Sequence, residues 1–258
     1  MKRIALLLTL LALAPVAYSQ IETPAPSPLQ KIEQKVGLTD VTLTYSRPSM
    51  KGRKIFGGLV PFGGAVWRTG ANANTTISFS DKVWIGDTEL PAGTYAIYSK
   101  PEAAYWDVMF YTDSNNWGAP AEWDESKVAA TIRVNTMPMN MDVETFTITF
   151  DDLKHDSVNL GIIWERTYVA VPIRVNTDAT VTASIESVMN GPSSGDYYAA
   201  AVYYLETGKD INKAKTWIDK AIEMRDNPAF WYHRQQSLIY AKSGDTKGAI
   251  KAAQRSLE

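Results

Sequence analysis

The sequence changes character near residue 176, and this change constrains the fold more than any other feature of the chain. Before it, short runs rich in β-branched and aromatic residues follow one another, and several alternate apolar with polar residues. Such alternation is typical of strands with one buried face. After it, apolar residues recur at helical spacing. The chain is therefore expected to divide into a strand region and a helical region.

Nine short strands are predicted, at residues 41–46, 75–80, 83–86, 94–99, 105–111, 128–134, 144–150, 158–164 and 168–175. Segments rich in Gly, Pro, Asn and Asp separate them, and no long helical pattern interrupts the series. Parallel strands joined by helices are therefore not expected. The predicted fold class is mainly β plus α: an antiparallel β-sandwich or jelly-roll-like domain, followed by a small four-helix tail.

The helical tail contains an internal repeat. Gly208 aligns with Gly244 and Ala214 with Ala249, which gives intervals of 36 and 35 residues. This pattern resembles tetratricopeptide repeats, whose period is about 34 residues. Because a stack of such repeats normally needs about three copies, one face of the tail is expected to rest on the sandwich or on a partner protein.

The first nineteen residues read as a secretory signal peptide. Lys2 and Arg3 precede an eleven-residue apolar run, and small residues at positions 17 and 19 suit cleavage after Ser19. The run is too short to cross a bilayer, so no membrane anchor is expected after cleavage. The sequence thus predicts a periplasmic or secreted protein. We expect the signal peptide at 1–19, an N-terminal segment at 20–35, the β-sandwich domain at 36–175, a linker at 176–192 and the tetratricopeptide-like repeats at 193–258.

Composition limits how such a protein can be stabilised and what it can bind. The chain contains no cysteine, so disulfides are excluded and the fold depends on its own core. Without the signal peptide, 24 basic residues stand against 28 acidic ones. This balance gives no indication of nucleic-acid binding.

Charge is distributed unevenly along the strand region. From Val41 to Ser80 there is no Asp or Glu, whereas the same forty residues contain five basic ones. Residues 46–72 within this segment contain six glycines and form a long connection of the kind that is often functional. Glycine lets the backbone approach a ligand closely, and guanidinium groups suit carboxylate, sulfate or phosphate oxygens. The functional interpretation is a pocket for an anionic or glycan small molecule, with candidate ligand-binding residues Arg47, Lys51, Arg53, Arg68, Asn72, Asn74, Trp117 and Trp123.

A structural interpretation of the same segment stays open at this point. Its arginines would then form surface ion pairs with acids elsewhere, such as Asp124, Glu125 or Asp151, and its asparagines would close turns. The tryptophans also divide into two groups. Trp84, Trp106 and Trp164 lie in strand patterns and are expected in the core, whereas the two candidate tryptophans lie in a loop where they could stack on a sugar.

Catalytic groups are scarce in the sequence. It contains two histidines, His155 and His233, and no phosphate-binding loop, dinucleotide-binding fingerprint or nucleophile elbow. We therefore expect no catalytic residues, no metal and no cofactor. A hydrolase with a carboxylate pair drawn from Asp107, Asp113 or Asp124 remains an alternative, because the separation of such a pair in space decides its chemistry.

The motifs "SRPSMKGRKIFGGLVPFGGAVWRTGANANTTISF", "LPAGTYAIYSKP" and "TDSNNWG" resemble the domain-of-unknown-function family 2911 over roughly residues 25–175. The resemblance implies an exported bacterial protein, often with a tetratricopeptide-like tail, and it implies no activity. Three hypotheses follow: a non-catalytic binding module, an envelope interaction scaffold that recruits a protein partner through the helical tail, and a carboxylate-dependent hydrolase.

Overall fold

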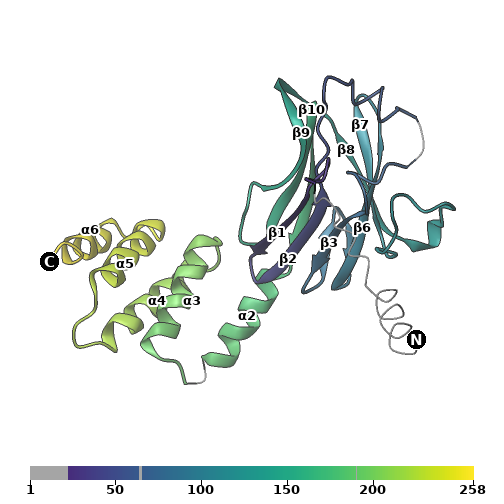
Figure 1. Ribbon diagram of the computed structural model, residues 1–258. Helices are drawn as coiled ribbons and strands as arrows, with labels where there is room; N and C mark the ends of the chain where they lie inside the picture. The colour runs from purple at the N-terminus through teal and green to yellow at the C-terminus, as the bar shows by residue number, and fades with distance from the viewer. Residues whose placement is uncertain (1–22, 64–65, 190) are drawn as a thin grey trace, which may run out of the picture. The chain divides into compact units, whose positions relative to one another are not determined.

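The computed structural model describes residues 23–63, 66–189 and 191–258 (Figure 1). The predicted signal peptide lies outside these residues. The chain divides into two compact units, a strand unit that ends at Arg174 and a helical unit from Val175 to Glu258. Each unit is described by itself below.

The strand unit contains two antiparallel sheets, which confirms the predicted fold class. One sheet has six strands in the order β1-β2-β3-β6-β7-β8, and the other has four in the order β5-β4-β10-β9. The bounds are β1 Leu29–Val36, β2 Thr39–Ser46, β3 Thr75–Phe79, β4 Val83–Ile85, β5 Thr88–Leu90, β6 Gly93–Pro101, β7 Tyr105–Tyr111, β8 Val128–Asn135, β9 Met137–Asp151 and β10 Ser157–Val175, with a short 3-10 helix at Glu125–Lys127.

Alternation along the strands builds the core between the sheets. Val41, Leu43 and Tyr45 of β2 are buried, while the residues between them are partly exposed. The facing sheet contributes Phe146 and Trp164, and the ring of Phe146 meets that of Tyr45 edge to face at 5.8 Å. Aromatic side chains therefore fill much of the space between the sheets.

Three features of the strand unit differ from the sequence-based expectation. The short strand β5 is not among the nine predicted strands. Strand β1 occupies the second half of the predicted N-terminal segment 20–35 and ends one residue beyond it. It pairs along its whole length with β2. The predicted strands at 158–164 and 168–175 form one long strand, β10, whose pairing with β9 is irregular around Glu165. Glu165 has a φ of 53°, so the chain bulges at this residue and continues as the same strand.

The helical unit contains the four predicted helices and one more. The four are α3 Ser194–Glu206, α4 Ile211–Glu223, α5 Phe230–Lys242 and α6 Thr246–Arg255. Asp210 caps α4 by accepting hydrogen bonds from the backbone N–H groups of Asn212 and Lys213. The additional helix, α2 Thr177–Val188, occupies most of the segment predicted as a linker.

Within the described residues, no helix has both the length and the apolar character that a membrane crossing requires.

Candidate functional site

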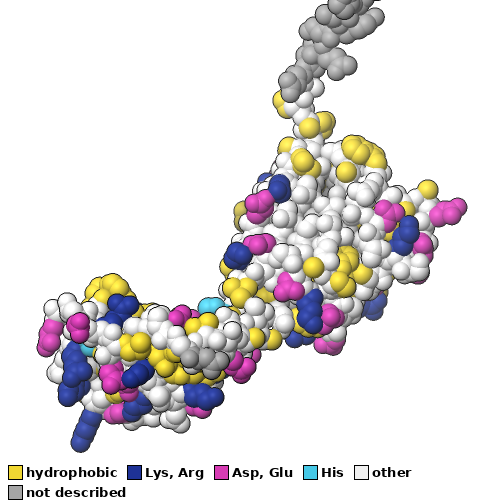
Figure 2. All heavy atoms as spheres, turned by 90° about the horizontal axis from the view of Figure 1, so that it is seen from below, with side chains coloured by type: hydrophobic (Ala, Val, Ile, Leu, Met, Phe, Trp, Pro, Cys, Tyr) yellow, Lys and Arg dark blue, Asp and Glu magenta, His cyan; other side chains and the backbone are white. Residues whose placement is uncertain are grey.

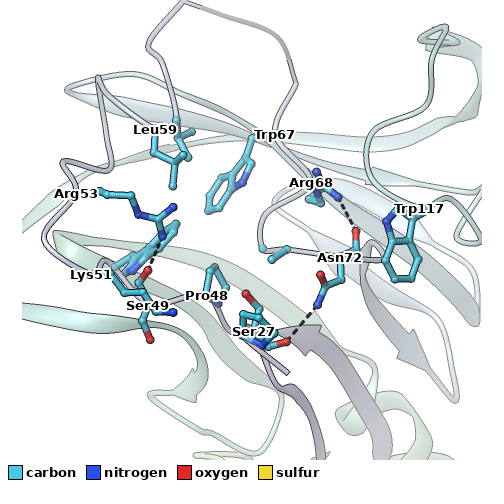
Figure 3. Close-up of a pocket in the computed structure, with 15 residues that line it drawn as sticks. Ser27, Pro48, Ser49, Lys51, Arg53, Leu59, Trp67, Arg68, Asn72 and Trp117 are labelled. Carbon is cyan, nitrogen blue, oxygen red and sulfur yellow. Dashed lines mark hydrogen bonds between the residues drawn. The ribbon is translucent and has the colours of Figure 1, made fainter. Parts of the chain in front are cut away.

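The strand unit has a cavity of about 820 Å³ beside the long glycine-rich connection between β2 and β3 (Figure 3). Side chains from both ends of this connection line it, together with Ser27 near the start of the described chain, Trp117 from a loop and Trp164 from β10. In Figure 3, Lys51 and Arg53 lie on one side of the cavity, and Arg68, Asn72 and Trp117 lie on the other. The acid-free segment thus supplies most of the polar lining.

Backbone pairing fixes the start of the connection against β9. The N–H of Met50 donates to the carbonyl of Glu144 at 2.8 Å, and the N–H of Phe146 donates to the carbonyl of Pro48 at 2.8 Å. A single bridge pairs Trp67 with Ser99 of β6. One end of the connection is therefore attached to each sheet, which places Arg53 and Arg68 at the same opening.

Carboxylates from elsewhere in the strand unit bind the backbone of this segment. Glu144 accepts a hydrogen bond from the N–H of Lys51 at 2.9 Å. Glu165, at the bulge in β10, accepts from the N–H groups of Ile55 and Phe56 at 3.4 and 3.2 Å. These acids therefore hold the loop through its main chain and not through its basic side chains.

The arginines of the cavity bind neutral acceptors. Arg53 donates from Nε to the carbonyl of Met50 at 2.9 Å and from Nη2 to the carbonyl of Ser49 at 2.7 Å. Arg68 donates from Nη1 to the carbonyl of Asn72 at 2.6 Å. Among the described residues, no carboxylate forms an ion pair with either arginine or with Lys51. Three positive charges thus line one cavity without a paired negative charge.

Two indole rings form an apolar part of the lining. Trp67 and Trp164 stack with their ring centroids 6.1 Å apart and an interplanar angle of 17°. The indole N–H of Trp164 donates to the carbonyl of Glu144 at 3.1 Å, which fixes its ring. Trp117, in contrast, is 78% exposed at the edge of the cavity. The cavity therefore combines a fixed aromatic surface with an aromatic side chain that a ligand could cover.

Residues with left-handed backbone conformations are concentrated around the cavity. Five described non-glycine residues have positive φ, and four lie in or beside the cavity lining: Lys51 at 49°, Thr69 at 51°, Asn72 at 60° and Glu165 at 53°. Such conformations are strained for residues with a Cβ atom and cluster at ligand sites in proteins. The packing of the surrounding residues therefore holds the cavity lining in backbone conformations that these residues do not favour by themselves.

Five of the eight predicted ligand-binding residues line this cavity: Lys51, Arg53, Arg68, Asn72 and Trp117. The amide Nδ2 of Asn72 lies 3.2 Å from the carbonyl oxygen of Ser27 and 3.3 Å from Oγ of Ser46. These contacts join the chain before β1 and the end of β2 to the cavity.

The other three predicted residues lie elsewhere. Arg47 donates to the carbonyl of Phe146 at 3.0 Å and to the hydroxyl of Thr147 at 2.7 Å, so its guanidinium joins the connection to β9. Asn74 is buried and donates to the hydroxyl of Tyr98. Trp123 packs against the rings of Tyr98 and Tyr111 in a second aromatic cluster. Their surroundings in the structure are those of packing residues.

The predicted surface pairs with Asp124, Glu125 and Asp151 do not occur among the described residues. Asp124 instead accepts hydrogen bonds from the backbone N–H and hydroxyl of Ser126. Asp151 accepts from the hydroxyls of Thr149 and Tyr168. The basic segment therefore keeps its charge unpaired.

Sequence reasoning missed several residues that build the cavity. Trp164 was expected only in the core, yet it is both 2% exposed and part of the lining. Glu144 and Glu165 gave no local signal, because each contacts backbone groups that are 93 to 110 positions away in the sequence. Only the pairing of distant strands brings them to the loop.

The three carboxylates considered for hydrolysis are each bound to other groups. A hydrogen bond from Arg133 lowers the pKa of Asp107, one from Lys127 lowers that of Asp113, and one from Ser126 lowers that of Asp124. A general acid in glycoside hydrolysis needs the opposite shift. No Asp or Glu belongs to the described lining of the cavity.

Within residues 23–63, 66–189 and 191–258, no group of three or more His, Asp or Glu side chains is arranged to hold a metal ion.

Comparison with known proteins supplies a family. No curated protein and no solved structure matches the chain. A family model described as "Protein of unknown function (DUF2911)" matches residues 27–173, which is more than half of the chain and nearly the whole strand unit. The resemblance seen in the motifs of the basic segment is thereby confirmed. The chain belongs to the DUF2911 family.

Proposed function

We propose that the strand unit is a non-catalytic binding module that takes a small anionic molecule, such as an acidic sugar, in the cavity beside its glycine-rich connection. One observation carries the proposal: Lys51, Arg53 and Arg68 line the same cavity, and no carboxylate is among the described residues that line it. A ligand that brings negative oxygens would provide the missing counter-charge.

Hydrogen bonds to backbone carbonyls hold the two arginine side chains in position before a ligand binds. Arg53 is held by two carbonyl groups and Arg68 by one, and each guanidinium still has N–H groups that are not used by these bonds. Since the side chains are already positioned, binding loses less conformational entropy than it would with mobile arginines. Planar guanidinium groups then suit a carboxylate or a phosphate.

The aromatic lining favours a ligand with a ring or another apolar face. Partly exposed Trp67, stacked on buried Trp164, offers such a surface next to the cations, and exposed Trp117 lies on the side of Arg68. A sugar ring presents C–H groups on one face and polar groups around its edge. An acidic sugar would therefore match both parts of the lining.

Localisation forms part of the proposal. The charged start, apolar run and small residues at positions 17 and 19 are those of a signal peptide, so we propose export to the periplasm or beyond, with cleavage after Ser19. Mass spectrometry of the exported protein would locate its first residue. A mature chain that begins elsewhere than Gln20 would contradict the predicted cleavage site.

A thermal-shift and calorimetric titration of residues 20–258 tests the binding proposal. The probes are galacturonate and its short oligomers, muramyl dipeptide and glucose 6-phosphate, with neutral cellobiose for comparison. At a ligand concentration about 100 times Kd, binding adds about 2.7 kcal/mol to the free energy of unfolding. We expect at least one anionic probe to give such a shift and cellobiose to give less.

Substitutions of cavity residues test whether the anionic probe binds in this cavity. Lys51→Ala removes a charge whose side chain makes no hydrogen bond to other described groups, and Arg68→Ala removes the charge on the opposite side. The matched control is Arg174→Ala, because Arg174 also donates to a carbonyl, that of Gly86, and does not line the cavity. The proposal fails if no anionic probe stabilises the protein, or if the cavity variants and the control bind it equally.

A further inference from the structure

The strongest unassigned feature is a row of methionines in β9: Met137, Met139 and Met141. The sequence contains eight methionines, and these three alternate with other residues over a short stretch of one strand. Methionine is among the residue types most often buried in proteins. Here, however, Met137 is 44% exposed and Met141 is 65% exposed. Packing in the core therefore does not explain why these side chains are concentrated in β9.

The strand directs the three side chains to one face. Phe146 and Ile148 of β9 are buried in the core, so the even-numbered side chains there point inward and the odd-numbered ones outward. At the other end of the strand, Met137 lies opposite Tyr168 of β10, and the next residue of β10, Val169, is buried. Tyr168 and Met137 therefore also point outward. The odd-numbered face is the outward one at both ends of β9, and the three methionines belong to it.

The pairing between β9 and β10 is interrupted at the methionines. Residues 139–142 of β9 lie opposite the single residue Arg166 of β10. Such an excess of residues on one strand forms a bulge, which disrupts the hydrogen-bonded ladder and bends the strand. The backbone that carries Met139 and Met141 is therefore less tightly bound by the sheet than the rest of β9, and it can adjust around a ligand.

The methionine side chains are long enough for their sulfur atoms to converge. In an extended strand, Cα atoms two residues apart are separated by about 7 Å. Each methionine sulfur lies three bonds beyond Cα on a side chain with three rotatable bonds. Sulfur atoms of neighbouring methionines in the row can therefore turn toward the same point, and bending at the bulge brings the third one closer.

The chemistry of these side chains selects one class of ligand. Thioether sulfur is soft and polarisable, and such ligands select Cu(I), whereas Mg²⁺ and Ca²⁺ prefer oxygen. Thioether is also a different class of ligand from the imidazole and carboxylate groups on which the expectation of no metal was based. Since the chain contains no cysteine, no thiolate competes for a soft ion. The cation opposite the bulge, Arg166, is paired with Asp142 at 2.8 Å, so its charge is balanced.

We propose that Met137, Met139 and Met141 form a binding site for the soft monovalent metal ion Cu(I), held by two or three thioether sulfur atoms. None of the three is among the described residues that line the anion cavity, so the site is independent of the function proposed above. Because the ligands are neutral and two of them are exposed, binding is reversible, and the fold does not depend on the metal.

Silver(I) is the first probe, because it shares the charge of Cu(I) and its preference for sulfur and is not oxidised by air. Residues 20–258 are labelled with ¹³C at the methionine methyl groups and titrated with silver nitrate in a buffer without chloride. We expect the methyl signals of Met137, Met139 and Met141 to shift and to saturate near one ion per protein. Leucine variants of single methionines assign these signals.

Met141→Leu keeps an apolar side chain of similar size at an exposed position and removes one sulfur, so the fold should be unaffected. Loss of a group that only orients a metal ligand costs about 10- to 100-fold in metal affinity, and loss of the ligand itself should weaken silver binding by about tenfold or more. Met139→Leu should act in the same direction. The matched control is Met224→Leu, because Met224 is 46% exposed in the helical unit and its replacement leaves the row intact.

The proposal is overturned if the methyl signals of the row do not shift, or if Met141→Leu and Met224→Leu weaken silver binding equally. Shifts of the same signals with Mg²⁺ would also overturn it, because they would show no preference for a soft ion. Cu(I) is then titrated without oxygen in competition with the chelator bicinchoninate. We expect the protein to take Cu(I) from the chelator and Met141→Leu to take less; equal uptake by both would exclude the row as the Cu(I) site.

Discussion

Arginines exposed on strands β8 and β10 and arginines in the cavity make different contacts. Arg133 of β8 makes two hydrogen bonds to the carboxylate of Asp107, at 2.7 and 2.9 Å, and Arg166 of β10 makes two to that of Asp142, at 2.8 and 3.4 Å. Among the described groups, the hydrogen-bond partners of Arg53 and Arg68 are backbone carbonyls only. Figure 2 shows the usual pattern on the surface of the strand unit, where basic side chains lie next to acidic ones.

This difference shows that hydrogen bonds can fix a basic segment in place without ion pairs that would neutralise its positive charges. The acids near the connection bind main-chain N–H groups, and its guanidinium groups bind main-chain carbonyls. Both partners in each bond are satisfied, and positive charge remains available at the cavity.

Removing a carboxylate that holds the loop should have the largest effect. Glu165→Ala leaves the N–H groups of Ile55 and Phe56 without their acceptor. We expect the free energy of unfolding to fall by about 2 kcal/mol, measured by urea denaturation. Alanine and glutamate are both strained at positive φ, so the change reports the lost hydrogen bonds.

The control for this variant is Glu122→Ala, since Glu122 is exposed and makes no hydrogen bond to other described groups. Its free energy of unfolding should match that of the unchanged protein. Equal stability of the Glu165 and Glu122 variants would show that the carboxylate at the bulge does not hold the loop.

Replacing arginine by lysine should weaken anion binding when the arginine lines the cavity and have no effect on it when the arginine is in an ion pair elsewhere. Arg53→Lys keeps the charge but cannot reproduce the two planar hydrogen bonds to Ser49 and Met50, so its charge becomes less fixed. We expect an anionic probe of the cavity to bind about fivefold more weakly, measured by calorimetry. Arg166→Lys, in the ion pair between β10 and β9, should leave this affinity unchanged. If the two variants bind the anionic probe with the same affinity, binding depends on the positive charge at residue 53 and not on the hydrogen bonds that position it.

The smallest effect concerns the outer pair of Asp107 and Arg133. The hydrogen bond from Arg133 lowers the pKa of Asp107 in the folded state. A lowered pKa stabilises the fold above the unfolded value of about 3.9, and this contribution is lost as the pH falls through the folded value. The stability difference between the unchanged protein and Asp107→Asn should therefore be constant above pH ~5 and disappear in stronger acid.

Urea denaturation between pH 2 and pH 7 measures this difference. Arginine stays protonated at every pH in this range, so the cavity should keep its guanidinium charges while the outer pair is lost. A stability difference that grows as the pH falls would contradict the direction of the pKa shift.

Much of the fold followed from local patterns. The runs that alternate in β2 and β9 form strands with one buried face, and Asp210, a residue type that favours the N-cap position, caps α4. Gly208 and Gly244 both have left-handed conformations after a helix, at φ of 68° and 84°. Period, caps and turn residues are properties of neighbouring positions, so sequence alone carries them.

The elements that sequence reasoning missed have weak local patterns. Helix α2 has the sequence TDATVTASIESV, which is rich in polar and β-branched residues that do not favour a helix. Strand β1 contains three charged residues and lies at the edge of its sheet, where one neighbour is enough. In both cases packing by the rest of the chain outweighs intrinsic preference.

Local patterns in the sequence are enough to predict that strands precede helices, that the tail repeats, and that basic residues and glycines are concentrated in one segment without acids. Which of those residues share the cavity depends on how distant strands pair in the folded protein. Arg47 and Arg53 lie six positions apart in the same segment, yet one crosses to the backbone of β9 and the other lines the opening. The reason is physical: the register between distant strands sets which carbonyl lies within reach of each guanidinium, and no local pattern encodes that register.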